Sequence, residues 1–231
     1  FGVKDKEAIK KKFPSVEMLL MSATPIPRSL NFALSALRDI SLITTPPINR
    51  VDIITKVYQQ SDEIILQALQ REFHRGGQVY LVHNDISSIH KIAEHWKNKY
   101  SMAKVGVLHG RMKQSEQDEI MYAFSNHHIN LLITTTVIES GIDIHNANTI
   151  IVTRADKFGL SQLHQLRGRV GRSQRQAYSY FLIPNYNYLT SQAKARLQAI
   201  EYLKSLGSGY QLSVQDLEIR GGGSILGKEQ S

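Results

Sequence analysis

The sequence predicts an α/β fold built around a parallel sheet. Between residues 53 and 183, short β-rich runs alternate with amphipathic segments of about ten residues. Strands separated by helices of this length form βαβ units with right-handed crossovers, and such units build parallel sheets. The 231 residues are 42% apolar, which is enough to bury one or two substantial cores.

The first half of the sheet is predicted from three strands and the helices that follow them. Each strand is a run of β-branched and apolar residues, and each helix has apolar residues at intervals of three or four. Gly76-Gly77 ends the first helix, because consecutive glycines interrupt helices. The predicted elements are the strand Ile53–Val57, the helix Glu63–Phe73, the strand Val79–Val82, the helix Ile86–Trp96, the strand Val105–Leu108 and the helix Ser115–Phe124.

Three further strands complete the predicted sheet, and a different pattern follows them. The elements are the strands Leu131–Thr134 and Thr149–Val152, the helix Leu160–Val170 and the strand Tyr178–Ile183; beyond Pro184 come a helix, Gln192–Leu206, and a short element, Val214–Ile219. Pro46-Pro47 separates the sheet from an earlier helix-like stretch. We therefore divide the chain into residues 1–47 (the end of another unit and a linker), 48–184 (the sheet domain) and 185–231.

The charge balance favours an anionic partner. Lysine and arginine exceed the acids by 28 − 20 = 8, and no acid occurs between Asp156 and Glu201. Such a local positive field suits nucleic acid.

The composition predicts neither a metal site nor a membrane segment. The chain has no cysteine, and its nine histidines lack metal-binding spacing, so no metal site is expected and the histidines are expected at the surface. No secretory signal and no apolar run of about 18 residues is present, so a soluble protein without membrane contact is expected.

The segment LHQLRGRVGRSQR (residues 163–175) is the strongest functional signal, with four arginines, two glycines and no acid. On a continuous helix, Gln165, Arg169 and Arg172 would share one face. Two guanidinium groups so close repel each other unless an anion lies between them. The alternative is a solvated basic face, but a surface helix needs no glycines, and we interpret the segment as a phosphate clamp.

Two further segments follow predicted strands at the carboxyl edge of the sheet, where ligands of parallel sheets collect. In TTTVIESGIDIHNAN, hydroxyls and backbone amides of Thr135 and Thr136 could bind a phosphate, and Gly141 permits a sharp turn. Glu139 and Asp143 offer carboxylates to ribose hydroxyls or to an arginine. In LHGRM (residues 108–112), the bare amide of a glycine could meet a phosphate, although this signal is weak alone.

These segments resemble motifs of a known family. The spacing Gln165-x-x-Gly168-Arg169-x-Gly171-Arg172 resembles motif VI of superfamily 2 helicases and translocases, residues 135–143 resemble motif V, and Ser22-Ala23-Thr24 matches motif III. SATPIPR, QLHQLRGRVGR and DLEIRGGGSILGKEQS narrow the resemblance to the group that contains RecG and the bacterial transcription-repair coupling factor. VYLVHNDISSIHKIAEHW and RADKFGLSQLHQLRGRVGRSQRQAY are more similar to the coupling factor, and the resemblance covers essentially the whole chain.

The resemblance implies an architecture and an activity. Residues 1–47 would end a first RecA-like lobe, residues 48–184 would form the second lobe, and residues 185–231 would form a helical hairpin and loop that act in translocation. The whole protein would hydrolyse ATP with Mg²⁺, move on double-stranded DNA, remove stalled RNA polymerase and couple transcription to nucleotide excision repair. RNA polymerase and a damage-recognition protein would bind other domains, in the bacterial cytoplasm.

The resemblance also implies roles for individual residues. Arg169 and Arg172 would reach the γ-phosphate, at least one as an arginine finger, and Gln165 would sense the nucleotide state. Those implied at the nucleotide are Glu139, Gly141 and Asp143. Those implied at DNA are Thr135, Thr136, His109, Gly110, Arg196, Arg220 and Gln230. Arg196 and Arg220 would tie the hairpin to its loop, and an ion pair of Arg220 with Asp216 or Glu218 is an equally weighted alternative.

One departure from the family pattern limits the expected activity. The chain contains neither a G-x-x-x-x-G-K-[ST] phosphate loop nor the acidic motif that holds magnesium, which the resemblance places upstream. The chain alone is therefore expected to be inactive and to bind no nucleotide tightly. Two other functions stay open: a RecG-like remodeller of replication forks, and a non-catalytic basic module that binds nucleic acid.

Overall fold

The computed structural model describes most of the predicted sheet domain and little of the regions around it. The described residues are 51–136 and 144–202, with the short stretches 8–9, 11–17, 214–216 and 218–219 and the single residues 19, 21, 41 and 43. Most of residues 1–47 and of the region after residue 202, including the predicted second part of the hairpin and its loop, lie outside this set. None of the described helices has the length and apolar character that a membrane crossing requires.

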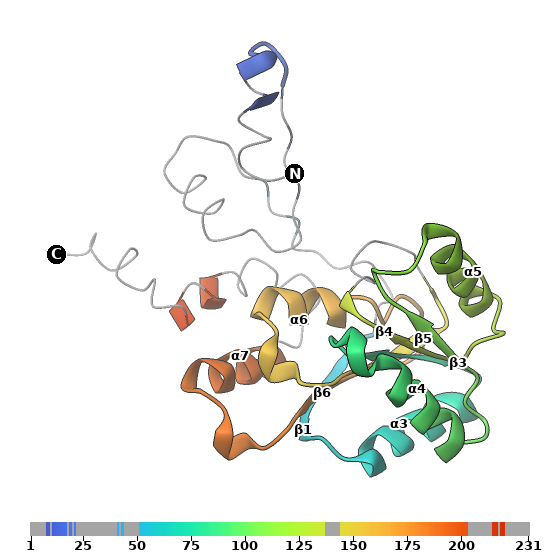
Figure 1. Cartoon of the computed structure of the whole chain (residues 1–231). Coiled ribbons are helices and arrows are strands. Elements are labelled where there is room, and N and C mark those ends of the chain that lie inside the picture. Colours follow the sequence, from blue (N-terminus) through green and yellow to red (C-terminus); the bar gives the residue numbers. More distant parts are fainter. Residues whose placement is uncertain are drawn as a thin grey trace.

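The core of the domain is a six-stranded sheet in which each pair of neighbouring strands is parallel. Its strand order is β1-β6-β5-β2-β4-β3 (Figure 1). This confirms the predicted α/β class and parallel sheet. The strands are β1 (Ile54–Gln59), β2 (Gln78–Val82), β3 (Val105–Leu108), β4 (Leu131–Thr134), β5 (Ala147–Val152) and β6 (Tyr178–Ile183).

Helices connect most of these strands. They are α3 (Asp62–His74), α4 (Ile86–Lys99), α5 (Gln114–Ser125), α6 (Leu160–Arg167) and α7 (Ser191–Tyr202), with the short 3-10 helices η3 (Ala155–Lys157) and η4 (Tyr186–Tyr188). Ser61 and Asp85 cap the first turns of α3 and α4 by accepting bonds from backbone amides. The two 3-10 helices were not predicted, because a single turn of three residues leaves no periodicity in the sequence.

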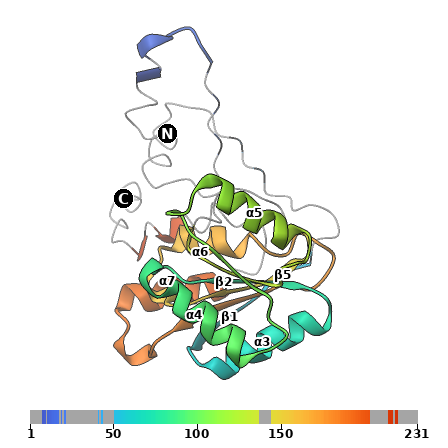
Figure 2. The same cartoon turned by 45° about the vertical axis from the view of Figure 1, so that its right-hand side comes forward.

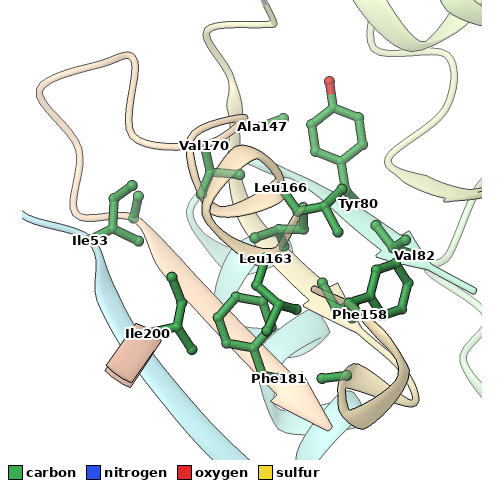
Figure 3. Close-up of a cluster of buried hydrophobic side chains, with 14 of the residues drawn as sticks. Ile53, Tyr80, Val82, Ala147, Phe158, Leu163, Leu166, Val170, Phe181 and Ile200 are labelled. Carbon is green, nitrogen blue, oxygen red and sulfur yellow. The ribbon is translucent and has the colours of Figure 1, made fainter. Parts of the chain in front are cut away.

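The helices form two layers, one on each face of the sheet, and each layer has its own apolar core. Side chains of α5, α6 and α7 pack on one face and those of α3 and α4 on the other. Figure 2 shows α5 and α3 on opposite sides of the sheet. On the first face, Leu163 and Leu166 of α6 and Ile200 of α7 are buried with Val82 and Phe181 of the sheet (Figure 3). The inner strands β2, β4, β5 and β6 are covered on both faces and read as continuous apolar runs, which explains why their bounds were predicted to within two residues.

The strand order creates a switch point between β5 and β2. The connection from β2 leads through α4 to β3 on one side of the sheet, and the connection from β5 leads through α6 to β6 on the other side. Because successive connections diverge there, the carboxyl ends of these two strands are a place where parallel sheets commonly bind ligands. The candidate residues described below fall in two places: at the carboxyl edge of the sheet, and on α6, α7 and the turn after α6, whose holding contacts lie just before β1, β2, β5 and β6.

Candidate functional site

The helix that carries the motif VI resemblance is shorter than predicted. We expected it to extend to Val170 and to present Gln165, Arg169 and Arg172 on one face, and this is wrong. Helix α6 ends at Arg167, with Gly168 as its C-cap. The chain then turns, with the amide of Arg169 donating to the carbonyl of Leu166 at 3.0 Å. Both arginines therefore lie on a turn after the helix.

We call residues 168–172 the arginine turn. Gly171 adopts a left-handed backbone conformation with φ of +76°, which a residue with a Cβ atom rarely adopts. The spacing of glycines in a sequence cannot distinguish a glycine in a turn after a helix from a glycine within the helix. Arg169 and Arg172 are half-buried, and Nε of Arg172 donates to the carbonyl of Gly168 at 3.4 Å. The turn thus brings a guanidinium group back over its own backbone.

Apolar packing holds the arginine turn on its inner side. The side chain of Val170 is fully buried in the same core as Leu163 and Leu166 (Figure 3). Gly171 lies directly against Ile53, such that a Cβ atom on this glycine would be 2.9 Å from Cγ1 of Ile53. A close approach that only a glycine permits therefore exists at Gly171, in a turn and not in a helix.

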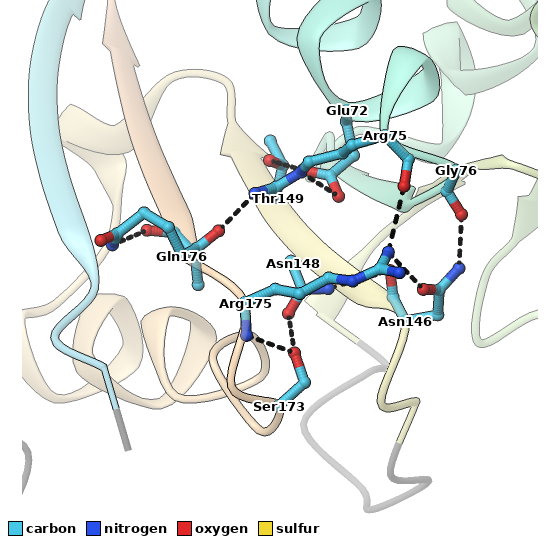
Figure 4. A network of polar contacts seen from close by, with 10 residues as sticks. Glu72, Arg75, Gly76, Asn146, Asn148, Thr149, Ser173, Arg175 and Gln176 are labelled. Carbon is cyan, nitrogen blue, oxygen red and sulfur yellow. Dashed lines mark hydrogen bonds and ion pairs between the residues drawn. The ribbon is translucent and has the colours of Figure 1, made fainter. Parts of the chain in front are cut away.

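A network of polar contacts holds the segment that follows the arginine turn (Figure 4). Nη1 of Arg75 donates to the carbonyl of Gln176 at 2.7 Å, and Nη1 of Arg175 donates to the carbonyl of Arg75 at 3.1 Å. The buried Glu72 accepts bonds from Arg75 and from Thr149. We call this network the polar clamp; its members are Glu72, Arg75, Gly76, Asn146, Asn148, Thr149, Ser173, Arg175 and Gln176.

The apolar core holds the middle of the arginine turn, and the polar clamp holds the segment directly after it. Ser173, next to Arg172, donates to Oδ1 of Asn148 at 2.8 Å, so the backbone is anchored one residue beyond the second arginine. Fixing a charged group before its ligand arrives lowers the cost of binding and of stabilising charge in a transition state. The arrangement can therefore present two positive side chains to an anion without large rearrangement of its backbone.

His164, on α6, is half-buried, which corrects the expectation that the histidines lie at the surface. Burial, and secondarily the neighbouring Arg167 guanidinium, lower the pKa of His164 from 6.5 to about 4. The neutral ring is therefore the form that fits the folded protein.

A loss of stability in acid is expected from His164. Because the folded state binds this proton less tightly than the unfolded chain, the contribution of neutral His164 is complete above pH 6.5 and is lost as the pH falls toward 4. At pH 4.5 the loss is about 2 kcal/mol of unfolding free energy. Urea unfolding of the wild type and of His164→Gln between pH 7.5 and 4.5 measures it. Equal pH dependence in the two proteins would contradict the assignment.

The predicted DNA-facing residues of two segments meet at the carboxyl edge of the sheet. β3 and β4 are neighbours, with Leu108 paired with Thr134, so His109 and Gly110 lie beside Thr135. Gly110 is exposed and His109 is half-buried. The amide of Thr135 donates to the carbonyl of Leu108 at 3.2 Å, so the expectation that this amide binds a phosphate is wrong: it continues the ladder of the sheet.

A polar cluster at the switch point was not predicted from the sequence. His83 follows β2 and Thr153 follows β5; Nδ1 of His83 lies 2.9 Å from Oγ1 of Thr153, and Nε2 lies 2.8 Å from Oγ of Ser88. Asp85 accepts from Ser88 and Ser87, and these bonds lower its pKa to about 2. Burial lowers the pKa of His83. The signal was available, since VHN directly follows a buried strand.

Arg196 and the remaining predicted residues fall in different places. Nε of Arg196 on α7 donates to the carbonyl of Phe158 at 3.2 Å, and Nη2 donates to that of Asp156 at 3.1 Å. Its guanidinium therefore contacts the segment that leads into α6. Thr136 is half-buried at the end of β4, and Gln165 is half-buried on α6. The predicted residues outside the described part of the chain are Glu139, Gly141, Asp143, Arg220 and Gln230.

The sequence is similar to a helicase family and to named relatives. The helicase conserved C-terminal domain matches residues 58–174. The transcription-repair-coupling factor of Haemophilus influenzae is 50% identical over 231 residues, and that of Escherichia coli is 48% identical over 231 residues; the alignments cover 100% of this chain. They cover 20% of each relative, so the chain spans about a fifth of their length.

Solved structures show the same fold. The structure of RecG bound to a three-way DNA junction superposes with a TM-score of 0.72 and 32% sequence identity, covering 91% of this chain and 29% of that one. This likeness confirms the RecA-like fold expected from the sequence. Saccharomyces cerevisiae Dbp5 L327V bound to RNA and ADP BeF3 superposes with a TM-score of 0.55 at 14% identity, covering 97% of this chain and 52% of that one, which supports the fold alone.

Proposed function

Because the chain belongs to the family of the helicase conserved C-terminal domain, we propose that it is the second motor lobe of an ATP-dependent translocase on double-stranded DNA. The observation that carries the proposal is the arginine turn: two half-buried arginines held between an apolar core and the polar clamp. Residues 48–184 form this lobe in the proposal. Residues 1–47 end the first lobe, and residues 185–231 form the hairpin and loop that act on DNA.

In the proposed mechanism, the arginine turn completes a nucleotide site whose other wall belongs to the first lobe. Arg169 and Arg172 contact the γ-phosphate, and Gln165 responds to its presence. Glu139, Gly141 and Asp143 border the nucleotide. These 231 residues would supply only one side of the nucleotide site, because they contain no complete phosphate loop. Bound ATP with Mg²⁺ supplies the phosphoryl group, and the arginines stabilise the charge that develops on it.

The carboxyl edge is the proposed DNA side of the lobe. Thr135 and Thr136 follow β4, and His109 and Gly110 follow the neighbouring strand β3. Thr135 is buried, so in the proposal the half-buried Thr136 and His109 and the exposed Gly110 make the contacts with the phosphate backbone. Closing and opening the seam between the lobes would then move them along the duplex. Arg196, Arg220 and Gln230 would pass this movement to DNA through the hairpin and loop.

We further propose that the whole protein acts as a transcription-repair coupling factor in the bacterial cytoplasm. Identities of 50% and 48% over all 231 residues to proteins of that name support this role. Its partners would be RNA polymerase and an excision-repair damage-recognition protein, bound through other domains. The likeness to RecG at 32% identity supports an alternative, the remodelling of replication forks. Assays on a stalled polymerase and on a forked DNA would separate the two.

The isolated chain is expected to show no ATP turnover. A chimera in which the chain replaces the matching segment of the E. coli coupling factor, 48% identical over 231 residues, is expected to hydrolyse ATP and to do so faster with duplex DNA. Phosphate release with and without DNA measures both. If the isolated chain turned over ATP as fast as the chimera, the two-lobed site would be refuted.

A further inference from the structure

Arg167, the last residue of α6, carries a buried charge that the proposed mechanism does not use. The residue is 2% exposed, although it lies between Gln165 and Arg169 in the sequence. Burial lowers the pKa of its guanidinium to about 10, and the carboxylate of Asp52 opposes this shift. A charge is rarely buried without hydrogen-bond acceptors, because losing hydration is costly. The positions of the hydrogen-bond acceptors of Arg167 therefore show which elements its side chain connects.

One acceptor of Arg167 lies on the next helix, α7. Nη1 donates to the carbonyl oxygen of Ile200 at 3.4 Å, and Ile200 is fully buried. The bond spans 33 positions of sequence and crosses from one helix to the other. Arg167 is also adjacent to Gly168, where the arginine turn begins. A single side chain thus connects the start of the arginine turn to α7.

Arg196 makes the same kind of contact in the opposite direction. It extends from α7 to the carbonyls of Asp156 and Phe158, which precede α6. Between these two contacts, Leu163 and Leu166 of α6 lie in one core with Leu197 and Ile200 of α7. We call the pair of contacts, Arg167 with Ile200 and Arg196 with Asp156 and Phe158, the arginine clasp. It fastens α6 to α7 near both ends of α6.

Apolar packing alone would hold the two helices together less specifically. Packed helices can slide past each other by small shear movements, since dispersion contacts have little directionality. A guanidinium that donates to a backbone carbonyl fixes the register between the helices, and it does so at fixed angles because the group is planar. The clasp therefore converts a displacement of α6 into a displacement of α7.

We infer that Arg167 is a positioning residue that transmits movement of the arginine turn to α7. The inference rests on the proposed function, in which the turn meets the γ-phosphate and the region from α7 onward acts on DNA. Arg167 touches neither of these ligands. Its loss leaves the arginine turn held by Val170, by Ile53 against Gly171 and by the polar clamp, while the link to α7 is weakened.

The test is the substitution Arg167→Met in the chimera with the E. coli coupling factor. Methionine fills a similar volume without the charge and without the hydrogen-bond donors. ATP hydrolysis without DNA is expected to be unchanged. Translocation per ATP hydrolysed, measured as displacement of a triplex-forming strand from linear duplex DNA, is expected to fall about tenfold.

Arg71→Met is the matched control. Arg71 is a half-buried arginine on α3, on the opposite face of the sheet, where its guanidinium stacks 3.5 Å from the ring centre of Tyr178. The substitution removes the same group from the opposite face of the sheet to α6 and α7. Translocation per ATP is expected to stay at the value of the unmodified chimera.

Each outcome decides the inference. A normal ratio of translocation to hydrolysis in Arg167→Met, or a loss of DNA-independent hydrolysis in a folded variant, would overturn it. If Arg167→Met does not fold, Arg167→Lys replaces it as the test, because lysine keeps the charge but lacks the planar fork of the guanidinium. An unchanged ratio of translocation to hydrolysis in Arg167→Lys would overturn the inference too. An unmodified chimera without DNA-stimulated hydrolysis would instead refute the proposed function, and the inference with it.

Discussion

Replacing Arg169 with alanine in the chimera is expected to lower ATP turnover at saturating DNA by about 10³-fold or more. In phosphoryl transfer, an arginine that contacts the transferring group stabilises charge that is absent from the ground state. The described geometry favours such a role, because the turn that carries Arg169 is held by a buried core on one side and by the polar clamp on the other. Steady-state phosphate release at saturating ATP and DNA measures the effect.

Lys157→Ala is the matched control for this substitution. Lys157 belongs to the same acid-free run, is exposed, and is not a member of the polar clamp. Its replacement by alanine removes the same net charge, so a few-fold loss of turnover at most is expected if position rather than net charge matters. A non-catalytic basic module predicts another pattern: both substitutions would weaken DNA binding to a similar extent, and turnover at saturating DNA would survive in each.

The inner strands β2, β4, β5 and β6 were predictable from the sequence because they are buried on both faces, whereas the edge strand β1 has exposed residues and its bounds were predicted less closely. The strands Val105–Leu108, Leu131–Thr134 and Tyr178–Ile183 were predicted with their observed bounds, since an apolar run between glycine-rich or polar segments has few alternatives. The parallel arrangement followed from the alternation of strands and helices. The order of the strands in the sheet was not predicted, because it depends on how the faces of the helices pack in the folded domain.

The conformation of the candidate site was less predictable than its composition. The arginines and glycines near residue 170 were identified, but helical spacing continues formally past Gly168, and only the structure shows that the helix ends at Arg167 and that Gly171 lies in a turn with a left-handed φ. The polar clamp could not be predicted from the sequence, because its members range from Glu72 to Gln176 and come into contact only in the folded sheet. His83 and His164 became distinguishable from surface histidines only through their burial.

The substitution Gly171→Ala tests whether the shape of the arginine turn is itself required. Two costs are expected in the unfolding free energy of the chain. A left-handed backbone costs an alanine about 1–2 kcal/mol. Its Cβ atom would also lie 2.9 Å from Cγ1 of Ile53, inside the contact distance, and overpacking of this kind costs about 1–3 kcal/mol. Urea unfolding measures the sum.

Gly76→Ala separates the two costs, because Gly76 has nearly the same backbone conformation, with φ of +71°, and nothing within 4 Å of the position of a Cβ atom. The alanine at residue 76 should therefore show the backbone cost alone and leave ATP turnover in the chimera intact. The alanine at residue 171 should lose more stability and also lower turnover, since relief of the contact with Ile53 shifts the backbone next to Arg172. Equal destabilisation by the two substitutions, with turnover retained in both, would mean that contact with Ile53 does not set the position of the arginines.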